Sequence, residues 1–446
     1  MRNPTTVLLA SCALAALVFA RANAGDGDAP PPAKPEPKPA APADPADPRA
    51  EHPNFPERYG DAPEELLPYR STCPNQRYFR EKMRFTGPGR DEPEPTGLKT
   101  IRLGLLAPVS GSPEVFIGHA MQEGTTLAVE EANKAGGHKG VPFEIVTRNE
   151  RAVWGEASNE IVAFAYEDGC WAMIGGCDGV NAHVALRVAL KIEMPMVSTS
   201  DPDPTLTETN IPWLIRVNPD DRQECYRLAT HVFEERKIER VAVLRANYRY
   251  ARAGIGEFVD SARRLGHPVV ADLRWAYGAT QLEGPFAKIR QTQAQAVVMW
   301  GHPAEMGAVV KAMREAGIDI PVFCSSRMVD ASFLAAAGPA AEGCTAPFPY
   351  DPNRDDPAWK SFRERFGKRF GHEPSQYAAY AYDGTRILLD AIAAKGLNRP
   401  LIRDHMVDRD WYDGVTGRMR FDPTANNISR CILARVKDGR FVYADR

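Results

Sequence analysis

The side chains that carry covalent, phosphate or zinc chemistry do not occur in this sequence at the spacings that such chemistry requires. There is no His-Glu-x-x-His, no Gly-x-Ser-x-Gly and no phosphate loop ending in Gly-Lys-Ser/Thr. No Gly-x-Gly-x-x-Gly follows the first apolar run, and the loop at 109–112 is too short to cradle a pyrophosphate. A triad assembled from scattered Asp, His and Ser residues has little weight in a chain of 446 residues. We therefore predict that the protein is not an enzyme and uses neither a cofactor nor a metal ion.

The cysteines do not suggest a metal site either, because there is no Cys-x-x-Cys and no His-rich companion. Seven of the eight follow the first 24 residues, and an odd number leaves at least one without an intramolecular partner. Cys170 and Cys177 bracket a predicted strand, which at about 3.3 Å per residue holds them roughly 23 Å apart, too far for a disulfide. Cys324 and Cys344 end and begin neighbouring strand-like runs, and they are the better candidate pair.

The first 24 residues have the pattern of a secretory signal. Arg2 precedes an apolar run at 7–20, and Ala22-Asn23-Ala24 predicts cleavage after Ala24. The run 9–12 also resembles a lipoprotein processing box, although most of the hydrophobicity follows Cys12, so lipidation there is the less favoured alternative. No later segment approaches the roughly 20 apolar residues of a membrane helix. We expect a periplasmic or otherwise exported soluble protein.

Two further segments precede the main domain. Residues 25–63 are Pro, Ala, Asp and Lys with almost nothing apolar, which predicts a disordered, extended linker. Residues 64–97 contain Leu66, Tyr69 and Phe79 among their charges and form an N-terminal extension without an assigned role. The net charge of −3 gives no support for binding nucleic acid.

From residue 98 onward, strand-like and helix-like segments alternate, which predicts an α/β fold. About 350 residues are more than one core usually holds, so two lobes are expected, each with a doubly wound parallel sheet. In such sheets the loops at the carboxyl ends of the strands form a crevice suited to a small molecule. The predicted strands are 101–107, 143–148, 171–175, 195–198, 240–246, 269–275, 296–300 and 322–325. The predicted helices are 118–135, 156–167, 180–191, 222–236, 255–265, 283–291 and 304–316.

Several motifs occur in an order and spacing that resembles a known family. They include IRLGLLAPVSG from Ile101, PMVSTSDPDPTLT from Pro195, YAYDGTRILLDAI from Tyr380 and GVTGRMRFDPTANN from Gly414. The sequence resembles the type I periplasmic binding proteins, in particular the leucine/isoleucine/valine-binding branch that feeds ABC transporters. The resemblance covers nearly everything from residue 100 to the end of the chain.

The resemblance implies two lobes joined by three hinge crossings, which close on a ligand. Lobe 1 would comprise 98–219 plus 347–414, and lobe 2 would comprise 220–346 plus 415–446. The crossings would then lie near Pro219, Ala346 and Gly417.

The family's ligand-contacting positions imply a candidate site, and several carry unusual residues here. In the family, serine and threonine donors for the ligand carboxylate follow the third strand, where this chain has Asp178. An alanine carbonyl and a threonine follow the fourth strand, where this chain has Ser200 and Pro202. Asp178 and Pro202 cannot donate the hydrogen bonds that hydroxyl groups there would donate. The candidate ligand-binding residues are Phe116, Asp178, Ser200, Tyr250, His302, Arg327 and Tyr377.

Arg327 is the largest departure from the family pattern. It matches the acidic residue that pairs with the amino group of an amino-acid ligand, and a guanidinium there should repel an ammonium and bind a carboxylate. Simpler roles are also open: Arg327 could form a salt bridge with Asp330 or Asp178. His302 could cap the following helix, and Tyr250, like Tyr377, could be a packing residue.

These observations predict an exported, monomeric solute-binding protein that captures a small polar organic ligand, either an organic acid or an amino-acid-like compound. It would deliver the ligand to an ABC permease in the inner membrane, without binding nucleic acid and without a membrane span of its own. The alternative is a ligand-responsive sensor or regulatory subunit that uses the same closure, which the Pro-rich linker and the 64–97 extension motivate.

Overall fold

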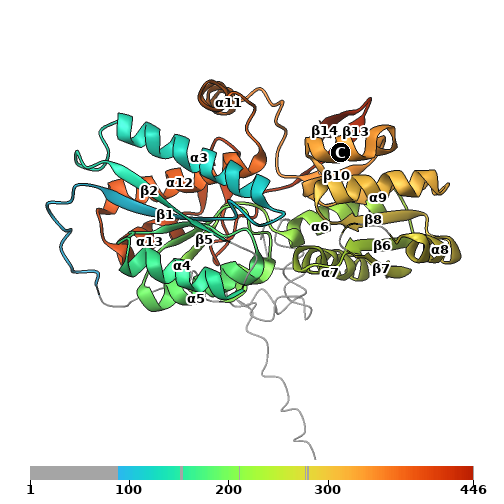
Figure 1. Ribbon diagram of the computed structural model, residues 1–446, viewed down its shortest axis with the longest axis horizontal. Helices are drawn as coiled ribbons and strands as arrows, with labels where there is room; N and C mark the ends of the chain where they lie inside the picture. Colours follow the sequence, from blue (N-terminus) through green and yellow to red (C-terminus); the bar gives the residue numbers. More distant parts are fainter. Residues whose placement is uncertain (1–88, 151–153, 210, 277, 279–280, 445–446) are drawn as a thin grey trace, which may run out of the picture. The chain divides into compact units, whose positions relative to one another are not determined.

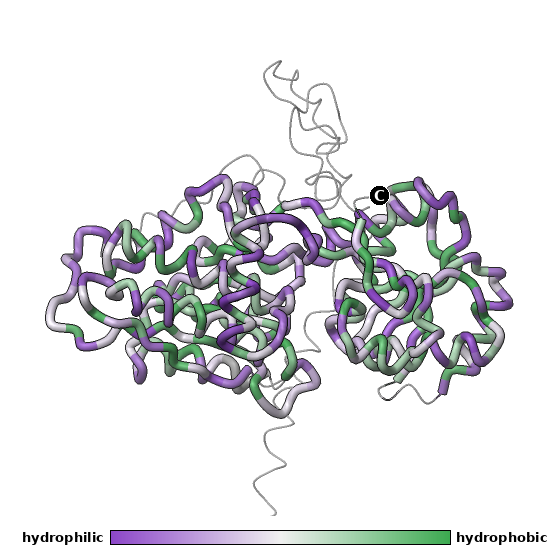
Figure 2. Tube along the Cα trace, turned by 90° about the horizontal axis from the view of Figure 1, so that it is seen from above, coloured by the Kyte–Doolittle hydropathy of each residue, from purple (hydrophilic) through white to green (hydrophobic). Residues whose placement is uncertain are grey.

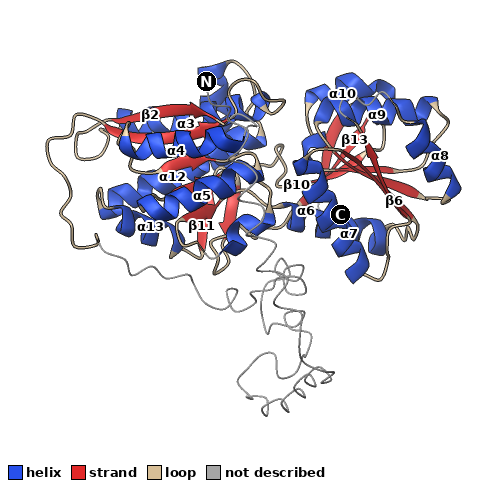
Figure 3. Ribbon diagram, turned by 60° about the horizontal axis from the view of Figure 1, so that its bottom comes forward, coloured by secondary structure: helices blue, strands red, loops and turns tan. Residues whose placement is uncertain are grey.

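The computed structural model describes residues 89–150, 154–209, 211–276, 278 and 281–444. The predicted signal, the predicted linker, Cys12, Cys73 and residues 64–88 of the extension lie outside these residues. The described chain forms two main sheets, the first parallel and the second parallel with an antiparallel edge, and helices cover both faces of each (Figures 1 and 3). The predicted fold of two doubly wound lobes is confirmed.

The sheet of the first lobe is parallel throughout and has the order β2-β1-β3-β4-β5. The order reverses between β1 and β3, so their carboxyl ends open onto a crevice. The strands are β1 (Ile101–Ala107), β2 (Phe143–Asn149), β3 (Met173–Gly175), β4 (Met196–Ser198) and β5 (Leu214–Arg216).

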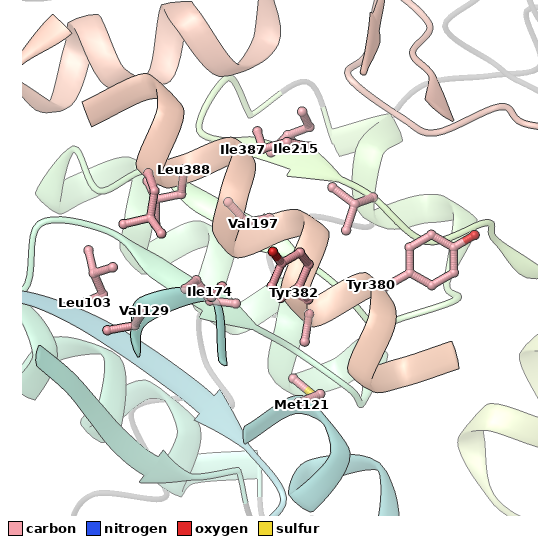
Figure 4. Close-up of a cluster of buried hydrophobic side chains, with 14 of the residues drawn as sticks. Leu103, Met121, Val129, Ile174, Val197, Ile215, Tyr380, Tyr382, Ile387 and Leu388 are labelled. Carbon is pink, nitrogen blue, oxygen red and sulfur yellow. The ribbon is translucent and has the colours of Figure 1, made fainter. Parts of the chain in front are cut away.

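Alternating strand residues send their side chains to opposite faces of this sheet. Ile174 packs with the core under one pair of helices, whereas its neighbour Met173 packs with the core under the other pair. The first pair is α3 (Val115–Lys134) and α12 (Gln376–Lys395), and the second is α4 (Trp154–Tyr166) and α5 (Gly179–Ile192). Figure 4 shows α12 over Ile174, with Ile387 and Leu388 among the buried side chains. The first lobe also includes α11 (Pro357–Phe370) and α13 (Arg399–Val407), with a 3-10 turn, η4 (Pro204–Thr209), after β4.

The sheet of the second lobe has the order β14-β13-β10-β9-β8-β6-β7. Its strands β7-β6-β8-β9-β10 repeat the winding of the first lobe, and β13 and β14 add an antiparallel edge. The strands are β6 (Val241–Ala246), β7 (Ala271–Trp275), β8 (Ala296–Trp300), β9 (Val322–Cys324), β10 (Thr345–Phe348), β13 (Ile432–Lys437) and β14 (Arg440–Ala444). The helices are α6 (Asp221–Ala229), α7 (Arg249–Arg264), α8 (Glu283–Gln291), α9 (Pro303–Glu315) and α10 (Ala331–Ala337), with short turns η5 (Thr230–Glu235), η6 (Ser326–Met328) and η7 (Gly338–Ala341).

The chain passes between the sheets three times: after β5, after β10, and between a hairpin and β13. The hairpin, β11 (Trp411–Gly414) and β12 (Gly417–Arg420), packs on the first lobe through Met419. Asp383 of α12 holds its turn, since its carboxylate accepts hydrogen bonds from Val415 N at 2.8 Å and Thr416 N at 2.9 Å. Burial raises the pKa of Asp383 to about 6.

Two of the predicted helices differ from the structure, one at its start and the other within its length. The helix predicted at 255–265 begins at Arg249, because Tyr248 takes the N-cap position and the first turn is polar and aromatic rather than periodic. The helix predicted at 222–236 is interrupted at Thr230 by a π-helical turn.

The predicted pairing of Cys324 with Cys344 is wrong. The cysteines of the described residues are free thiols in the interior. Phe323 lies opposite Thr345 in the parallel pair of β9 and β10, which places the two cysteines diagonally, two residues out of register. Strand geometry then separates their Cα atoms by about 8 Å, beyond the reach of a disulfide.

The described end of the N-terminal extension, residues 89–97, lies against the first lobe. Arg90 forms a salt bridge with Asp404, and Glu94 accepts a hydrogen bond from Leu397 N at 3.0 Å and contacts His138 at 2.6 Å. Polar residues interrupt the hydrophobic ones along the chain (Figure 2), and no described helix is both long and apolar enough to cross a membrane.

Candidate functional site

Six of the candidate residues follow strands that lie at the reversal of strand order in each sheet or one strand beyond it. Phe116 follows β1, Asp178 follows β3 and Ser200 follows β4 in the first lobe. In the second lobe Tyr250 follows β6, while His302 and Arg327 follow β8 and β9. Because ligands of doubly wound sheets bind outside the carboxyl ends of the strands at these reversals, the topology places all six where a small molecule is expected.

Arg327 brings the two lobes together. Its side chain is 3% exposed, and its Nη1 donates a hydrogen bond to Glu114 Oε1 at 2.6 Å and to His302 Nδ1 at 3.2 Å. Its guanidinium carbon lies 3.5 Å from the centre of the Tyr250 ring, a cation–π contact. The expected alternatives for a salt bridge, Asp330 and Asp178, are both wrong, because the partner is Glu114 at the N-cap position of α3.

The electrostatics of this pair show that both partners are charged. Burial raises the pKa of Glu114, but the charge of Arg327 and its hydrogen bond outweigh burial, so the pKa of Glu114 lies below its ordinary value. Burial lowers the pKa of Arg327, and Glu114 more than restores it. The positive charge of Arg327 is therefore already matched by an internal carboxylate.

His302 is a neutral hydrogen-bond partner at pH 7, because burial and the charge of Arg327 lower its pKa to about 4. It occupies the N-cap position of α9 without a side-chain capping bond. Its ring stacks on Tyr248 at 4.5 Å between centroids, and the Tyr248 hydroxyl accepts from His302 N at 2.6 Å. That hydroxyl donates in turn to Glu305 Oε2 at 3.0 Å, which fixes the orientation of the imidazole behind Arg327.

Phe116 and Tyr377 meet edge to face, with ring centroids 6.0 Å apart. Together with Arg327 they line a cavity of about 410 Å³, a volume typical of small-molecule sites. We call it the large cavity. Its other lining residues include several aromatic rings and carboxylates, namely Phe348, Tyr350, Tyr443, Glu123, Asp330 and Glu373.

Two smaller cavities are lined by Tyr250, and one of them shares Arg327 and Tyr377 with the large cavity. Ser200, Tyr250 and Tyr377 line one of about 30 Å³, and Asp178 and Tyr250 line another of about 10 Å³. We call these the small cavities. Ser200 is buried, and its hydroxyl has no hydrogen-bond partner among the described residues. Each has room for about one or two water molecules.

Asp178 is committed to the helix that follows it. It occupies the N-cap position of α5, and its Oδ1 accepts hydrogen bonds from Val180 N at 3.0 Å and Asn181 N at 3.3 Å. This is the ordinary role of an aspartate at a helix start. Burial and the charge of Glu114 raise the pKa of Asp178.

A second internal carboxylate occupies the backbone donors after β3. Glu150 accepts hydrogen bonds from Cys177 N at 2.9 Å and Asp178 N at 3.2 Å. Burial raises the pKa of Glu150 well above its ordinary value. These backbone N–H groups belong to the loop where the family resemblance places donors for a ligand carboxylate. Glu150, an acid of the protein itself, therefore already accepts the hydrogen bonds that these N–H groups could donate to a ligand.

Sequence reasoning missed the remaining acids of the small cavities: Asp201, Asp203, Asp221 and Glu224. Asp221 and Glu224 lie in the first turn of α6, whose N-cap Asp220 forms a capping box with Gln223. The run NPDDRQE indicates only a helix start, since acidic residues favour that position in any helix. The only signal in the sequence that this helical turn lies near the crevice was its position directly after the strand β5.

Comparison with known proteins places the chain in a family. The family model described as "Periplasmic binding protein" matches residues 100–440. The chain is 25% identical over 355 residues to the "Leu/Ile/Val-binding protein homolog 2" of Brucella abortus, which covers 78% of this chain and 94% of that protein.

Solved structures share the fold. The branched-chain amino acid transporter substrate-binding protein of Streptococcus pneumoniae, in complex with isoleucine, aligns with a TM-score of 0.70 at 24% identity, over 78% of this chain and all of that chain. A solute-binding protein of R. palustris in complex with benzoate aligns with a TM-score of 0.69 at 18% identity, over 77% of this chain and 95% of that chain. At these identities the two structures establish the fold and leave the ligand of this chain open.

Proposed function

The chain belongs to the periplasmic binding protein family, and we propose that it captures a small polar organic ligand between its lobes and delivers it to an ABC permease of the inner membrane. The ligand is an organic acid or an amino-acid-like compound. The observation that carries the proposal is the meeting of both lobes at Arg327, which joins Glu114 of the first lobe to His302 and Tyr250 of the second.

The proposed mechanism is hinge closure without covalent chemistry. The hinges would be the three passages after β5, after β10 and between β12 and β13, so the boundaries expected at Ala346 and Gly417 move to the ends of β10 and β12. A ligand that contacts both walls binds more tightly to the closed state and so shifts the population toward it. Because the small cavities, at about 30 and 10 Å³, are too small for an organic ligand, we expect a ligand to enter them when the lobes separate.

The proposed ligand contacts combine both sides of Arg327. Phe116 and Tyr377 offer aromatic faces to the apolar part of the ligand in the large cavity. Ser200, Tyr250 and His302 lie toward the small cavities or against Arg327 and contact its polar part. We propose no catalytic step and no cofactor, and we propose that the protein is exported as a monomer that does not bind nucleic acid.

A second candidate function is a ligand-responsive sensor or regulatory subunit. It is favoured by residues 89–97, which lie against the first lobe through Arg90 and Glu94 rather than leading away from it. A docked extension of this kind could report the state of the lobe to a protein partner. Stable copurification of a partner other than a permease, dependent on residues 64–97, would support this candidate.

The test of the proposed function uses the mature chain from Gly25 onward. Isothermal titration calorimetry against amino acids, amines and carboxylates detects capture, and small-angle X-ray scattering detects closure as a smaller radius of gyration with ligand. Reversible binding of at least one compound with compaction is the expected result. Binding without compaction would contradict hinge closure, and turnover of a bound compound would contradict a pure binding role.

A further inference from the structure

The groups of the small cavities that could hold an anion are already paired with carboxylates of the protein. Arg327 is paired with Glu114 at 2.6 Å. Arg249 is paired with Asp203 at 2.6 Å, and Arg249 lines the smaller of the small cavities. The backbone N–H groups of Cys177 and Asp178 are held by Glu150. An incoming carboxylate would have to displace one of these internal acids and leave it buried, at a cost in binding free energy.

Carboxylate oxygens without partners remain in the same cavities. Both carboxylate oxygens of Asp221 are buried without a hydrogen-bond partner among the described residues, and the side chain is 1% exposed. Glu224 accepts hydrogen bonds from Ser326, but its Oε2 has none, and Oδ2 of Asp201 has none. Asp201 and Asp221 line one small cavity and Glu224 lines the other.

An unpaired buried carboxylate costs folding free energy unless a cation or a proton satisfies it. Arg327 faces both Asp221 and Glu224 and attracts them, but its guanidinium contacts Glu114 rather than either acid. The described residues offer no cluster of ligands suited to a metal ion. The chemistry that matches these oxygens is therefore a positively charged nitrogen with several N–H donors, an ammonium or a guanidinium.

We propose that the cleft selects a ligand carrying such a cationic nitrogen, held by Asp221 and Glu224 of α6 with Asp201 of the opposite lobe, and that it rejects carboxylates that lack one. This inference rests on the proposed function and narrows its ligand to the amino-bearing class. The hydroxyls of Thr199 and Ser200, also buried without partners, complete the polar wall. An N–H group of the ligand can donate to either hydroxyl.

Arg327 considered alone would predict a cleft that selects an anion, whereas the unpaired acids predict one that selects a cation. Its charge opposes an ammonium at one side of the small cavities, while Glu114 cancels that charge within contact distance. Beyond these ion pairs, Asp201, Asp221 and Glu224 remain without a basic side chain in contact among the described residues. Burial raises the pKa of all three acids, so they hold protons in the ligand-free protein, and a bound cation would take the place of such a proton.

The experiment compares compounds that differ in one charged group. Calorimetry at pH 7.5 measures the affinity of the mature protein for leucine, for 3-methylbutylamine, which lacks the carboxyl group, and for 4-methylpentanoate, which lacks the amino group. Arginine, agmatine, putrescine and benzoate extend the panel to larger cations and an aromatic acid. We expect at least one compound with a cationic nitrogen to bind, and 4-methylpentanoate and benzoate to bind at least a hundredfold more weakly.

Variants assign the selectivity to residues. Glu224→Gln and Asp221→Asn keep the size of each side chain and remove its ability to become a carboxylate opposite a bound cation, so each should weaken the binding of the cation at least tenfold. Glu144→Gln is the matched control, since Glu144 is half-exposed and pairs with Arg102 on the outside of the first sheet. Thermal unfolding of each variant without ligand confirms that it folds, and Glu224→Asp provides a conservative replacement that retains the charge and should retain part of the affinity.

The outcomes separate this inference from the function on which it rests. Equal binding of 4-methylpentanoate and leucine, or cation binding unchanged in both Glu224→Gln and Asp221→Asn, would overturn the cation-selective cleft while capture itself stood. Binding of acids alone would do the same. Failure of every compound to bind would count against solute capture and, with it, against the inference.

Discussion

Replacing Glu224 by Gln should stabilise the ligand-free protein at pH 7 and leave its stability nearly unchanged at pH 4. Burial raises the pKa of Glu224 to about 8, and the hydrogen bonds from Ser326 and the charge of Arg327 offset only part of that rise. The titratable and charged groups that face Glu224 are the N-cap Asp220 with Asp221 and Cys225 of its own helix, Arg327 of η6, Tyr250 of α7, Tyr377 of α12 and Cys431.

The sign and size follow from the two protonation states. In the unfolded chain the carboxyl has its ordinary pKa of 4.5, whereas the folded protein holds the proton up to about pH 8. Because the pKa of Glu224 rises on folding, the folded state has its full stability below about pH 4.5, where the carboxyl is protonated in both states. That stability is lost as the pH rises toward 8, because the unfolded chain can release the proton and the folded protein cannot. At pH 7 keeping the proton costs about 3 kcal/mol of folding free energy. Gln carries no such cost, and its carbonyl oxygen still accepts from Ser326.

Urea unfolding of the wild type and of Glu224→Gln, followed by tryptophan fluorescence between pH 4 and pH 8, measures this difference. We expect the variant to gain roughly 2–3 kcal/mol at pH 7 and nothing measurable at pH 4. Glu144→Gln should show no gain at either pH, because its side chain is half-exposed. A loss of stability at pH 7, or a gain of the same size at both pH values, would refute the description of Glu224 as a buried acid without a cation.

Three further predictions concern the surroundings of the site. Arg327→Gln leaves Glu114 buried without its partner and should lower the free energy of unfolding by about 3 kcal/mol or more. Adding Glu114→Gln should recover most of that loss, which a double-mutant cycle by urea unfolding measures. Additive losses from the two substitutions would contradict the ion pair. Gly124→Ala should destabilise the protein by about 1–3 kcal/mol, since the new Cβ would lie 2.0 Å from the Ala378 carbonyl oxygen. Gly256→Ala should stabilise the protein slightly, because the space around its new Cβ is open. Similar Tm values for both variants would contradict the close packing of α3 on α12. The His302 ring should stay neutral down to about pH 4 in an NMR titration, and a midpoint near 6.5 would show that it is solvated rather than buried beside a cation.

The strands and helices could be predicted from sequence because their signals are local. The apolar runs of β1, β6 and β8 and the helical periodicity of α8 and α9 depend on neighbouring residues alone. The start of α7 was missed for the same reason, because Arg249 and Tyr250 in its first turn carry no apolar period. The positions of Tyr250 and Arg327 near the crevice followed from the family pattern, since both come after strands whose carboxyl ends meet there.

The partners within the site could not be predicted, because they join residues far apart in the sequence. Glu114 and Arg327 are separated by 213 positions, and nothing in either neighbourhood indicates the other. Glu150 ends up against the N–H groups of Cys177 only once β2 and β3 have taken their places on either side of β1. Which acid neutralises which base depends on contacts in the folded protein. The residue type at one aligned position, such as Arg327, indicates only the charge of that residue.

The paired and unpaired acids together suggest how a ligand would control closure. The contact between Glu114 and Arg327 joins the two lobes and favours their approach even without a ligand. In the same state Asp221 and Glu224 are buried, and their unpaired oxygens oppose that state at neutral pH. A cationic ligand would relieve that opposition in the closed state alone, and this difference in free energy between the two states is what a ligand needs in order to shift a conformational equilibrium. An organic acid would add a further negative charge to the same wall and favour the open state, so the two ligand classes should move the radius of gyration differently: compaction with the cation, and no compaction with the acid.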